Sequence, residues 1–364
     1  MFKIIKISIL YFLITFLIFG CNDKSIIEWE VLNSNETNLK GQGEEFEKLL
    51  IYRNNYFLIG QDEKSNNWQD FEAITYESKN SGRVWKKVIN DEGNFIDGYV
   101  NNEFLNLIAE KCSDNSYKNC ETKLSIYNRV NYNKIDDKII CKRDSSIVRV
   151  FSDDNKSYAL INKGYIANKN YIFNSENDFK TYKKAEINKP IKQIDFFNDK
   201  IYFLTNEYFV EDYETIEKNK LFILNNKSLD SIETKYVVED FCVDKNGLYL
   251  LSKVNEKIII NHIDNKKHKN KTLTVVNEKE LEPKMIYKYN NFVAVLVNSI
   301  NVKGLGGFGS AAYKLYLSLD NGETFKEEKL PIDNYVKPIE FYKDKLIIFY
   351  AGAGRICRGT VKEY

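Results

Sequence analysis

Six cysteines and only two histidines are the residue types of this chain that most directly suggest chemistry. Histidine is the usual general base beside a serine nucleophile, so a Ser-His-Asp site would have to use His262 or His268. His262 lies in an alternating run that predicts a strand, and His268 lies in a lysine-rich segment; neither accompanies a nucleophile motif. We therefore predict no catalytic residue, no bound metal and no cofactor.

Two glycine-containing segments could approach a ligand closely. The segment Lys303–Ser310 is rich in glycine, but no G-K-[ST] follows and no βαβ pattern surrounds it, which favours an insertion loop over a phosphate site. Arg355 follows Gly352 and Gly354, and its guanidinium could bind a carboxylate bidentately. The alternative for Arg355 is an ordinary surface position.

Charge and composition exclude two classes of protein. The 364 residues include 53 Lys and Arg against 52 Asp and Glu, so the net charge of +1 argues against a nucleic-acid binder. A hydrophobic fraction of 43% and an aromatic fraction of 14% can supply a core, which excludes a disordered chain. These values favour one large β domain or two ordinary ones.

The first 20 residues have the pattern of an export signal. Lys3 and Lys6 precede an apolar run, Ile7–Phe19, whose 13 residues are too few to span a membrane comfortably. Gly20 stands directly before Cys21, and this pattern resembles the lipobox of bacterial lipoproteins. In that family the cysteine thiol is acylated, with palmitate among the chains, and this cysteine becomes the mature N-terminus.

The resemblance implies a division of the chain into three parts. Residues 1–20 would be the signal peptide, residues 21–25 the lipidated cysteine with a short tether, and residues 26–364 a single domain. The alternatives are a plain secretory signal that a cysteine follows by chance, or an uncleaved anchor. The implied location is a bacterial membrane, facing the periplasm or the cell surface, and the choice between inner and outer membrane stays open.

Export permits disulfides. Cys112 and Cys120 flank a polar, turn-rich segment between two strand-like runs, so they are predicted to face each other across a hairpin and to be bonded. Cys141, Cys242 and Cys357 form an odd set, so at least one is expected to be a buried thiol, and their pairing stays open. No C-x-x-C occurs, and a zinc site is not indicated.

Strand signals dominate the rest of the chain. Short runs of Tyr, Phe, Ile, Val and Leu, such as Tyr56–Gly60, Ile147–Phe151 and Phe292–Val297, are bounded by Asn, Asp, Gly and Lys. Helical periodicity is nearly absent after residue 21. We expect Glu211–Lys220 to be part of a long loop rather than a helical turn.

One turn-like motif occurs in three copies. Its residues are Ser78, Asn80, Gly82 and Trp85 in the first copy, Ser318, Asp320, Gly322 and Phe325 in another, and Ser175 and Asn177 in a copy that lacks the glycine. These segments resemble the Asp-box, or BNR repeat, of sialidase-like β-propellers, where it forms the turn between the third and fourth strands of a blade. The chemistry fits a turn, because the Asn or Asp side chain can cap backbone N–H groups, glycine takes a positive φ and the aromatic residue covers the bend.

The spacing of the motif predicts the number of blades. The copies start at residues 78, 175 and 318, which fits a repeat of about 48 residues and seven four-stranded blades. Blades are then expected to begin near residues 47, 94, 145, 190, 237, 283 and 334. The last blade lacks a strand, which Ile26–Leu32 can supply, because the sequence after Trp29 resembles that after Trp85. This all-β propeller would be closed by its N-terminal strand, leaving no exposed sheet edge.

This topology predicts which loops share a face. Connections between second and third strands would meet at one end, away from the turn motifs and from the membrane. That end carries the aromatic residues and the arginine of a candidate protein-binding face: Trp68, Phe71, Tyr117, Tyr208, Phe209, Tyr213, Phe308 and Arg355. The alternative is that about half of them pack into the ring. The lysine-rich segment at residues 264–271 falls on the opposite side, as a solvated turn or a contact with anionic lipid.

The resemblance to sialidases raises an enzymatic alternative. That family needs three arginines, a tyrosine nucleophile with a glutamate partner, an acid aspartate and an R-I-P motif near the start. The nearest string here is Arg355-Ile356-Cys357, at the other end and without proline. An arginine cluster with a Tyr–Glu pair in the central funnel would favour a divergent glycoside hydrolase, whereas an aromatic, carboxylate-poor funnel would favour binding.

We therefore predict a monomeric, membrane-anchored and non-enzymatic protein-binding module, of the assembly-factor, receptor or toxin-immunity type. The lipid bilayer, reached through acylated Cys21, and a protein on the distal face are the expected partners, with no nucleic acid. A sialidase-like hydrolase or a glycan-binding protein is the alternative, and a structural envelope component is a third class.

Overall fold

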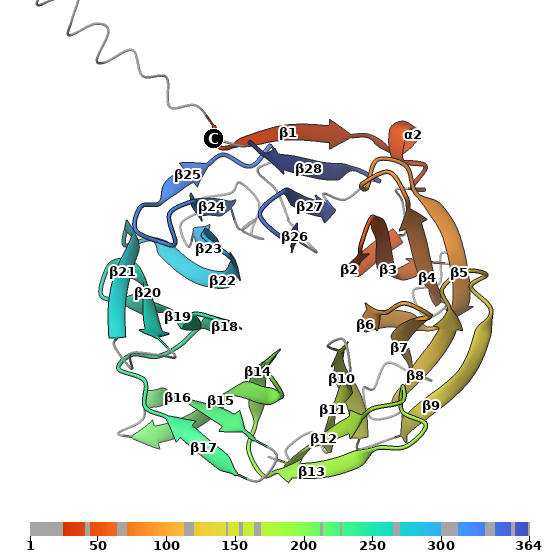
Figure 1. Cartoon of the computed structure of the whole chain (residues 1–364), viewed down its shortest axis with the longest axis horizontal. Coiled ribbons are helices and arrows are strands. Elements are labelled where there is room, and N and C mark those ends of the chain that lie inside the picture. Colours follow the sequence, from red (N-terminus) through yellow and green to blue (C-terminus); the bar gives the residue numbers. More distant parts are fainter. Residues whose placement is uncertain are drawn as a thin grey trace, which may run out of the picture.

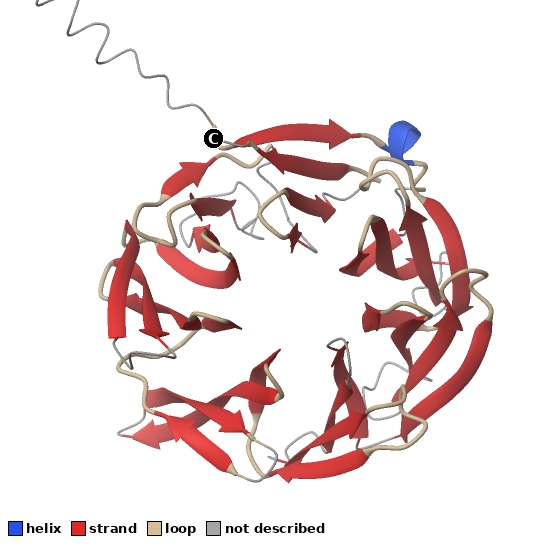
Figure 2. Cartoon of the chain, viewed as in Figure 1, coloured by secondary structure: helices blue, strands red, loops and turns tan. Residues whose placement is uncertain are grey.

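Seven four-stranded antiparallel sheets surround a central axis in the computed structural model (Figure 1). The structure describes residues 25–40, 44–63, 71–112, 120–142, 145–152, 156–163, 169–211, 214–225, 228–264, 270–299, 312–331, 339–350 and 354–362. Apart from one helical turn, α2 (Ser34–Thr37), the regular elements of these ranges are strands (Figure 2). Within them, no helix has the length and apolar character that crossing a bilayer requires.

Six blades consist of four consecutive strands each, ordered from the axis outward. Blades 1 to 3 are β2 (Glu44–Tyr52), β3 (Asn55–Glu63), β4 (Phe71–Ser78) and β5 (Lys86–Glu92); β6 (Asn94–Val100), β7 (Phe104–Cys112), β8 (Cys120–Asn128) and β9 (Lys134–Lys142); and β10 (Ser145–Ser152), β11 (Ser157–Lys163), β12 (Lys169–Ser175) and β13 (Lys183–Ile187). Blades 4 to 6 are β14 (Ile191–Phe197), β15 (Lys200–Glu211), β16 (Glu214–Leu224) and β17 (Leu229–Ile232); β18 (Asp240–Asp244), β19 (Gly247–Val254), β20 (Lys257–Asp264) and β21 (Asn270–Asn277); and β22 (Leu281–Tyr289), β23 (Phe292–Ser299), β24 (Ala312–Ser318) and β25 (Lys326–Glu328). The innermost strands begin at residues 44, 94, 145, 191, 240 and 281, each within three residues of the predicted starts.

The seventh blade joins the two ends of the chain. It contains β26 (Ile339–Tyr342), β27 (Leu346–Tyr350), β28 (Ile356–Val361) and, outermost, β1 (Ile27–Leu32). β1 runs antiparallel to β28 with Trp29 opposite Gly359, and the two strands lie side by side in Figure 1. The Trp29 ring lies 5.7 Å from that of Phe349 on β27. Both the predicted propeller of seven blades and its closure by the N-terminal strand are confirmed.

The core lies between the blades. The buried apolar residues form seven clusters, and each cluster joins two neighbouring blades. Leu105 and Leu107 of blade 2, for example, pack with Phe57 and Ile59 of blade 1. The second strands supply much of this core because both of their faces are covered, so their sequences are almost continuously apolar. The alternation that marks a half-exposed strand is therefore weak in this chain.

The three turn motifs have the same hydrogen-bond geometry. In each, the serine Oγ accepts the backbone N–H four residues later, from Gly82, Phe179 and Gly322, at 3.0, 2.8 and 2.7 Å. The Oδ1 atoms of Asn80, Asn177 and Asp320 accept the N–H four residues after them at 2.9 Å. All three turns connect the third and fourth strands of a blade.

The copy without glycine differs in which aromatic residue is buried. Trp85 of the first copy is buried and donates its indole N–H to the Gly82 carbonyl at 2.9 Å. In the degenerate copy Phe179 takes the glycine position with φ of 60° and is itself buried. Tyr182, which holds the position of Trp85 in this copy, is 49% exposed and does not cover the bend. Phe179 supplies the buried ring, which explains how this turn forms without glycine.

One predicted loop was wrong. Residues Glu211–Lys220 belong to a long hairpin, in which β15 pairs with β16 from Ile201↔Leu224 to Glu211↔Glu214. The sequence of this hairpin mixes many charged residues with Tyr, Phe, Val, Thr and Ile. The charged residues suggested a loop, but the β-branched and aromatic types favour strands, and pairing between the two segments decides the outcome.

Candidate binding face and central channel

The predicted binding loops all connect the second and third strands of their blades. They join β3 to β4, β7 to β8, β15 to β16, β23 to β24 and β27 to β28. Because strands alternate in direction, these connections lie at one end of the ring, which we call the 2–3 face. The turn motifs lie at the other end, the 3–4 face. The topology thus gathers the five predicted loops on one side.

The structure describes four of the eight residues predicted for this face. Trp68, Tyr117, Tyr213 and Phe308 lie outside the described residues. Phe71 is half-buried at the start of β4, opposite Glu63, and Arg355 is half-buried just before β28. The backbone of Tyr208 pairs with that of Glu217, and the backbone of Phe209 with that of Ile216. These placements do not test whether the side chains form one surface.

The β15–β16 hairpin is the most prominent described feature of the 2–3 face. Its strands have 12 and 11 residues. The inner neighbour β14 pairs with β15 only as far as Thr205, and the outer neighbour β17 pairs with β16 only from Leu221 onward. Within the described residues, the segments 206–211 and 214–219 therefore pair only with each other. They form a two-stranded ribbon that extends past the rest of blade 4, and both of its edges lack a strand partner.

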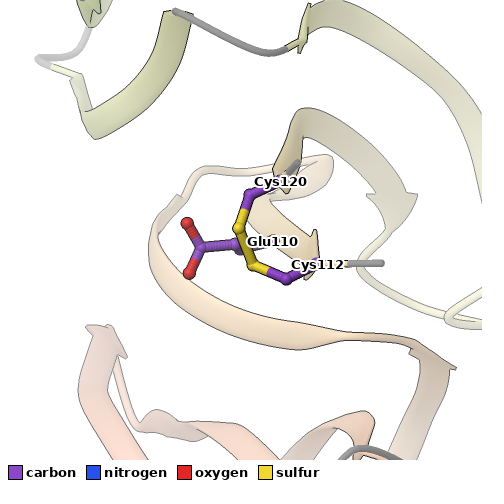
Figure 3. A group of neighbouring side chains, drawn as sticks. All are labelled: Glu110, Cys112 and Cys120. Carbon is purple, nitrogen blue, oxygen red and sulfur yellow. A yellow bond between two sulfur atoms is a disulfide. The ribbon is translucent and has the colours of Figure 1, made fainter. Parts of the chain in front are cut away.

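A disulfide lies at the end of another hairpin on this face. Cys112 on β7 and Cys120 on β8 stand directly opposite each other and are bonded, as the hairpin pattern predicted (Figure 3). Cys141, Cys242 and Cys357 are free thiols. Burial raises the pKa of Cys141 to about 11 and that of Cys357 to about 12. These two thiols are therefore protonated at neutral pH and poorly nucleophilic.

Ionisable side chains of the inner strands converge on the axis, which no sequence motif indicated. Lys48 of blade 1 forms an ion pair with Asp97 of blade 2. The charges of Lys48 and of Arg149 on blade 3 both act on Glu340 of blade 7. Arg149 also acts on Asp195 of blade 4. Blades 3 and 7 are not neighbours in the ring, so the charge of Arg149 acts on Glu340 across its axis.

Several of these side chains also connect the blades to one another. Asp97 accepts the N–H of Val150 on the next blade at 2.8 Å, and Asp240 accepts that of Ile286 at 2.7 Å. Gln193 on blade 4 forms two hydrogen bonds to one backbone residue of blade 5, one as donor and one as acceptor. An innermost strand has no further strand beside it, so these side chains satisfy backbone groups that the sheet leaves open.

Loss of contact with water changes the acidity of this cluster. Burial raises the pKa of Asp195 and of Asp240 to about 6 each. Burial also raises the pKa of Glu340 to about 7, although Lys48 and Arg149 oppose the shift. These carboxyl groups therefore exchange protons near neutral pH, unlike ordinary surface carboxylates.

The described residues of the inner strands show neither the arginine cluster with a Tyr–Glu pair that would favour a hydrolase nor the carboxylate-poor, aromatic lining that would favour binding. These strands carry several carboxylates, and Arg149 is the one arginine among their described residues. A buried Tyr–Glu pair does exist, in which Tyr76 donates to Glu44. Tyr76 lies on the third strand of its blade, away from the axis, and burial together with Glu44 raises its pKa far above the usual value. A phenol that ionises this reluctantly is a poor nucleophile.

Comparison with known proteins shows the fold. No protein-family model matches the chain, and no curated protein matches it. Among solved structures, YCF48 bound to a D1 peptide is similar with a TM-score of 0.61 and 11% identity, covering 92% of this chain and 97% of that one. The WD40 propeller of Doa1 has a TM-score of 0.54 and 8% identity, covering 92% and 98%.

A third similar structure differs in how its ring closes. The propeller domain of the Trilobed protease from Pyrococcus furiosus has a TM-score of 0.50 and 11% identity, covering 89% of this chain and 97% of that domain. It is described as having an open velcro topology. In the present chain, by contrast, β1 pairs with β28 along six residues and closes the ring.

Proposed function

We propose that this chain is a lipid-anchored, non-enzymatic protein-binding propeller of a bacterial envelope. The observation that carries the proposal is the β15–β16 ribbon on the 2–3 face, whose two edges have no strand partner among the described residues. An open strand edge can bind an extended segment of another protein, because the segment completes its backbone hydrogen bonds.

The comparisons support a peptide or protein as the ligand class. YCF48, a propeller of similar extent, is described in complex with a peptide. The interior of the ring also fits a ligand that binds on the 2–3 face. Many of its described polar groups bind one another between neighbouring blades, so they are already engaged. Such a surface would suit an assembly factor, a receptor or a toxin-immunity protein.

The anchor part of the proposal rests on the sequence around Cys21. The lipobox resemblance supports acylation of this cysteine, and two or more acyl chains hold a domain on a bilayer stably. The tether of residues 22–25 spans at most about 14 Å. Because β1 is an outermost, fourth strand, the chain enters it at the 3–4 face, where the Asp-box-like turns lie. The 3–4 face would then lie toward the bilayer and the 2–3 face toward a partner.

Removal of the ribbon tests the binding proposal. A variant in which an Asn-Gly turn joins Asn206 to Asn219 deletes residues 207–218. It keeps the Asn206↔Asn219 pair and the buried hydrogen bond from the Asn219 side chain to the Val238 carbonyl. The matched control is Val130→Ser, at a 78% exposed position on the β8–β9 turn of the 3–4 face. We expect the full chain and the control to retain a protein from envelope extracts, and the ribbon-less variant to retain at least about tenfold less. Equal retention by all three, or retention of glycan alone, would contradict the proposal.

A further inference from the structure

A third potential metal ligand lies beside the disulfide of blade 2. Glu110 and Cys112 are two residues apart on β7, so their side chains are on the same side of the strand. Cys120 stands opposite Cys112 on β8. One carboxylate oxygen and the two sulfur atoms all lie within 4.8 Å of one another. Figure 3 shows the Glu110 side chain beside the disulfide. Strand pairing creates this set, which no sequence spacing indicates.

We propose that the Cys112–Cys120 pair has a second state in which, after reduction, the two thiolates and the Glu110 carboxylate bind one Zn²⁺ ion. Tetrahedral zinc takes sulfur ligands at about 2.3 Å and carboxylate oxygens at about 2.0–2.2 Å. Its ligand atoms are therefore about 3.5–3.8 Å apart, which the three side chains reach with small movements. Cys112 is exposed, so a water molecule can fill the fourth position.

The change of state is a balanced thiol–disulfide exchange. A dithiol reductant attacks the bond between the two sulfur atoms, is itself oxidised to a disulfide, and leaves two thiols on the protein. Zinc binding then releases the two thiol protons, because the thiolate is the ligand. The disulfide and the metal are mutually exclusive, so each state holds the ends of β7 and β8 together by different chemistry.

The charges around Glu110 favour a bound cation between the reduced Cys112 and Cys120 over two reduced cysteines without a metal ion. The carboxylate of Glu47 on blade 1 acts on that of Glu110, so a second negative charge lies near the three ligand atoms. A cation at Glu110 would relieve the repulsion between the two carboxylates. The neighbouring lysines are engaged elsewhere, since Lys111 pairs with Glu92 at 2.5 Å and Lys142 pairs with Glu121 at 2.9 Å.

Zinc titration of the purified full chain in detergent tests the proposal, with a chromophoric chelator as competitor. We expect the dithiol-reduced protein to bind one more equivalent of Zn²⁺ than the oxidised protein. Glu110→Gln should weaken this binding at least about tenfold. The control is Glu121→Gln, which changes the residue beside Cys120 whose carboxylate pairs with Lys142, and it should leave the affinity within about twofold.

Two outcomes would overturn the proposal. One is equal zinc binding by reduced and oxidised protein, a comparison that needs no variant. The other is unchanged affinity in Glu110→Gln. Titration with Co²⁺ gives an independent check: the reduced protein should develop a sulfur-to-cobalt charge-transfer band that the Cys112→Ser/Cys120→Ser double variant lacks, and persistence of this band in the double variant would assign the metal to other thiols.

Discussion

At the scale of single residues, the three turn motifs show how side chains replace backbone partners. A serine hydroxyl and an amide or carboxylate each accept a backbone N–H inside the bend, and a residue of positive φ lets the chain reverse. Gly82 has φ of 82°, and a Cβ atom there would overlap the end of the Ile348 side chain on blade 7. The turn therefore needs glycine both for its backbone conformation and for close packing between blades.

Gly82→Ala should destabilise the propeller by about 1–3 kcal/mol, because alanine is strained at positive φ and its methyl group displaces Ile348. Urea unfolding followed by tryptophan fluorescence measures the effect. Val84→Ala, at a 43% exposed position of the same turn, is the control and should change the free energy of unfolding by less than about 0.5 kcal/mol. A Gly82→Ala variant as stable as the wild type would show that this turn tolerates a side chain.

The buried carboxyl groups of the channel predict an unusual pH dependence of stability. The pKa values of Asp195 and Asp240 are raised to about 6 and that of Glu340 to about 7, whereas unfolded carboxyl groups titrate near 4. The folded state therefore holds these protons more tightly. The resulting stabilisation is complete below pH of about 4 and is lost as the pH rises through about 6 to 7. His262, whose pKa is lowered by burial, acts in the opposite direction.

We accordingly expect the free energy of unfolding to be higher at pH 5.5 than at pH 8, by about 1–3 kcal/mol. The double variant Asp195→Asn/Asp240→Asn should flatten this dependence. Asp136→Asn removes an exposed carboxyl group whose pKa is lowered, first by Lys138, so it should leave the profile over this range unchanged. A wild-type protein that is more stable at pH 8 than at pH 5.5 would contradict the assignment.

The sequence allowed the turn residues to be predicted, but not the channel cluster, and the reason is physical. The turn motif is local, so all its partners lie within eight residues. Lys48, Asp97, Arg149 and Glu340 come from four blades and meet only because the ring closes. Each of them occupies an ordinary strand position, where a single charged residue usually indicates a solvated face.

At the scale of the elements, the closing strand β1 is held along one edge and at its start. β1 pairs with β28 on one side, and the residues just before it bind Glu328 of blade 6. Ser25 Oγ donates to the Glu328 carboxylate at 2.6 Å, and the backbone N–H of Ile26 donates to its other oxygen. Glu328 is buried, so the point where the chain enters the ring is fixed to two blades.

Glu328→Ala should destabilise the protein by about 1–3 kcal/mol, because it leaves the buried N–H of Ile26 without its acceptor. Thermal unfolding by circular dichroism measures the change, and hydrogen exchange should increase most in β1. Glu323→Ala removes a carboxylate that forms an exposed ion pair with Lys271, so it is the matched control and should have little effect. Equal melting temperatures for the two variants would show that the hydrogen bonds from Ser25 and Ile26 to Glu328 contribute nothing to closure of the ring.

Strand positions and blade boundaries were largely predictable, because turn residues interrupt the apolar runs at a regular spacing. The β15–β16 ribbon was not, since its strands lack the apolar faces that a packed sheet requires. Among the described residues, the segments 206–211 and 214–219 pair with each other and with no further strand of blade 4, so they do not need to be apolar. Apolar runs, which predict buried strands, therefore do not predict the β15–β16 ribbon, although the proposed function depends on it.

At the scale of the whole molecule, closure fixes which segments share a face. The confirmed pairing of β1 with β28 makes the ring continuous, so every connection between second and third strands lies at one end. The proposed anchor at Cys21 fits this geometry, because its short tether would place the 3–4 face near the bilayer. The central claim is that the ring binds a protein with the face that points away from the membrane.

Site-specific photo-crosslinking in intact cells tests this claim most directly. A photoreactive amino acid is placed either at position 209 in the ribbon or at position 130 on the β8–β9 turn, in the full chain carrying its own N-terminus. The account predicts a discrete protein adduct from position 209, and no protein adduct or a lipid adduct from position 130. A protein adduct from position 130 with none from position 209 would contradict both the binding face and the orientation.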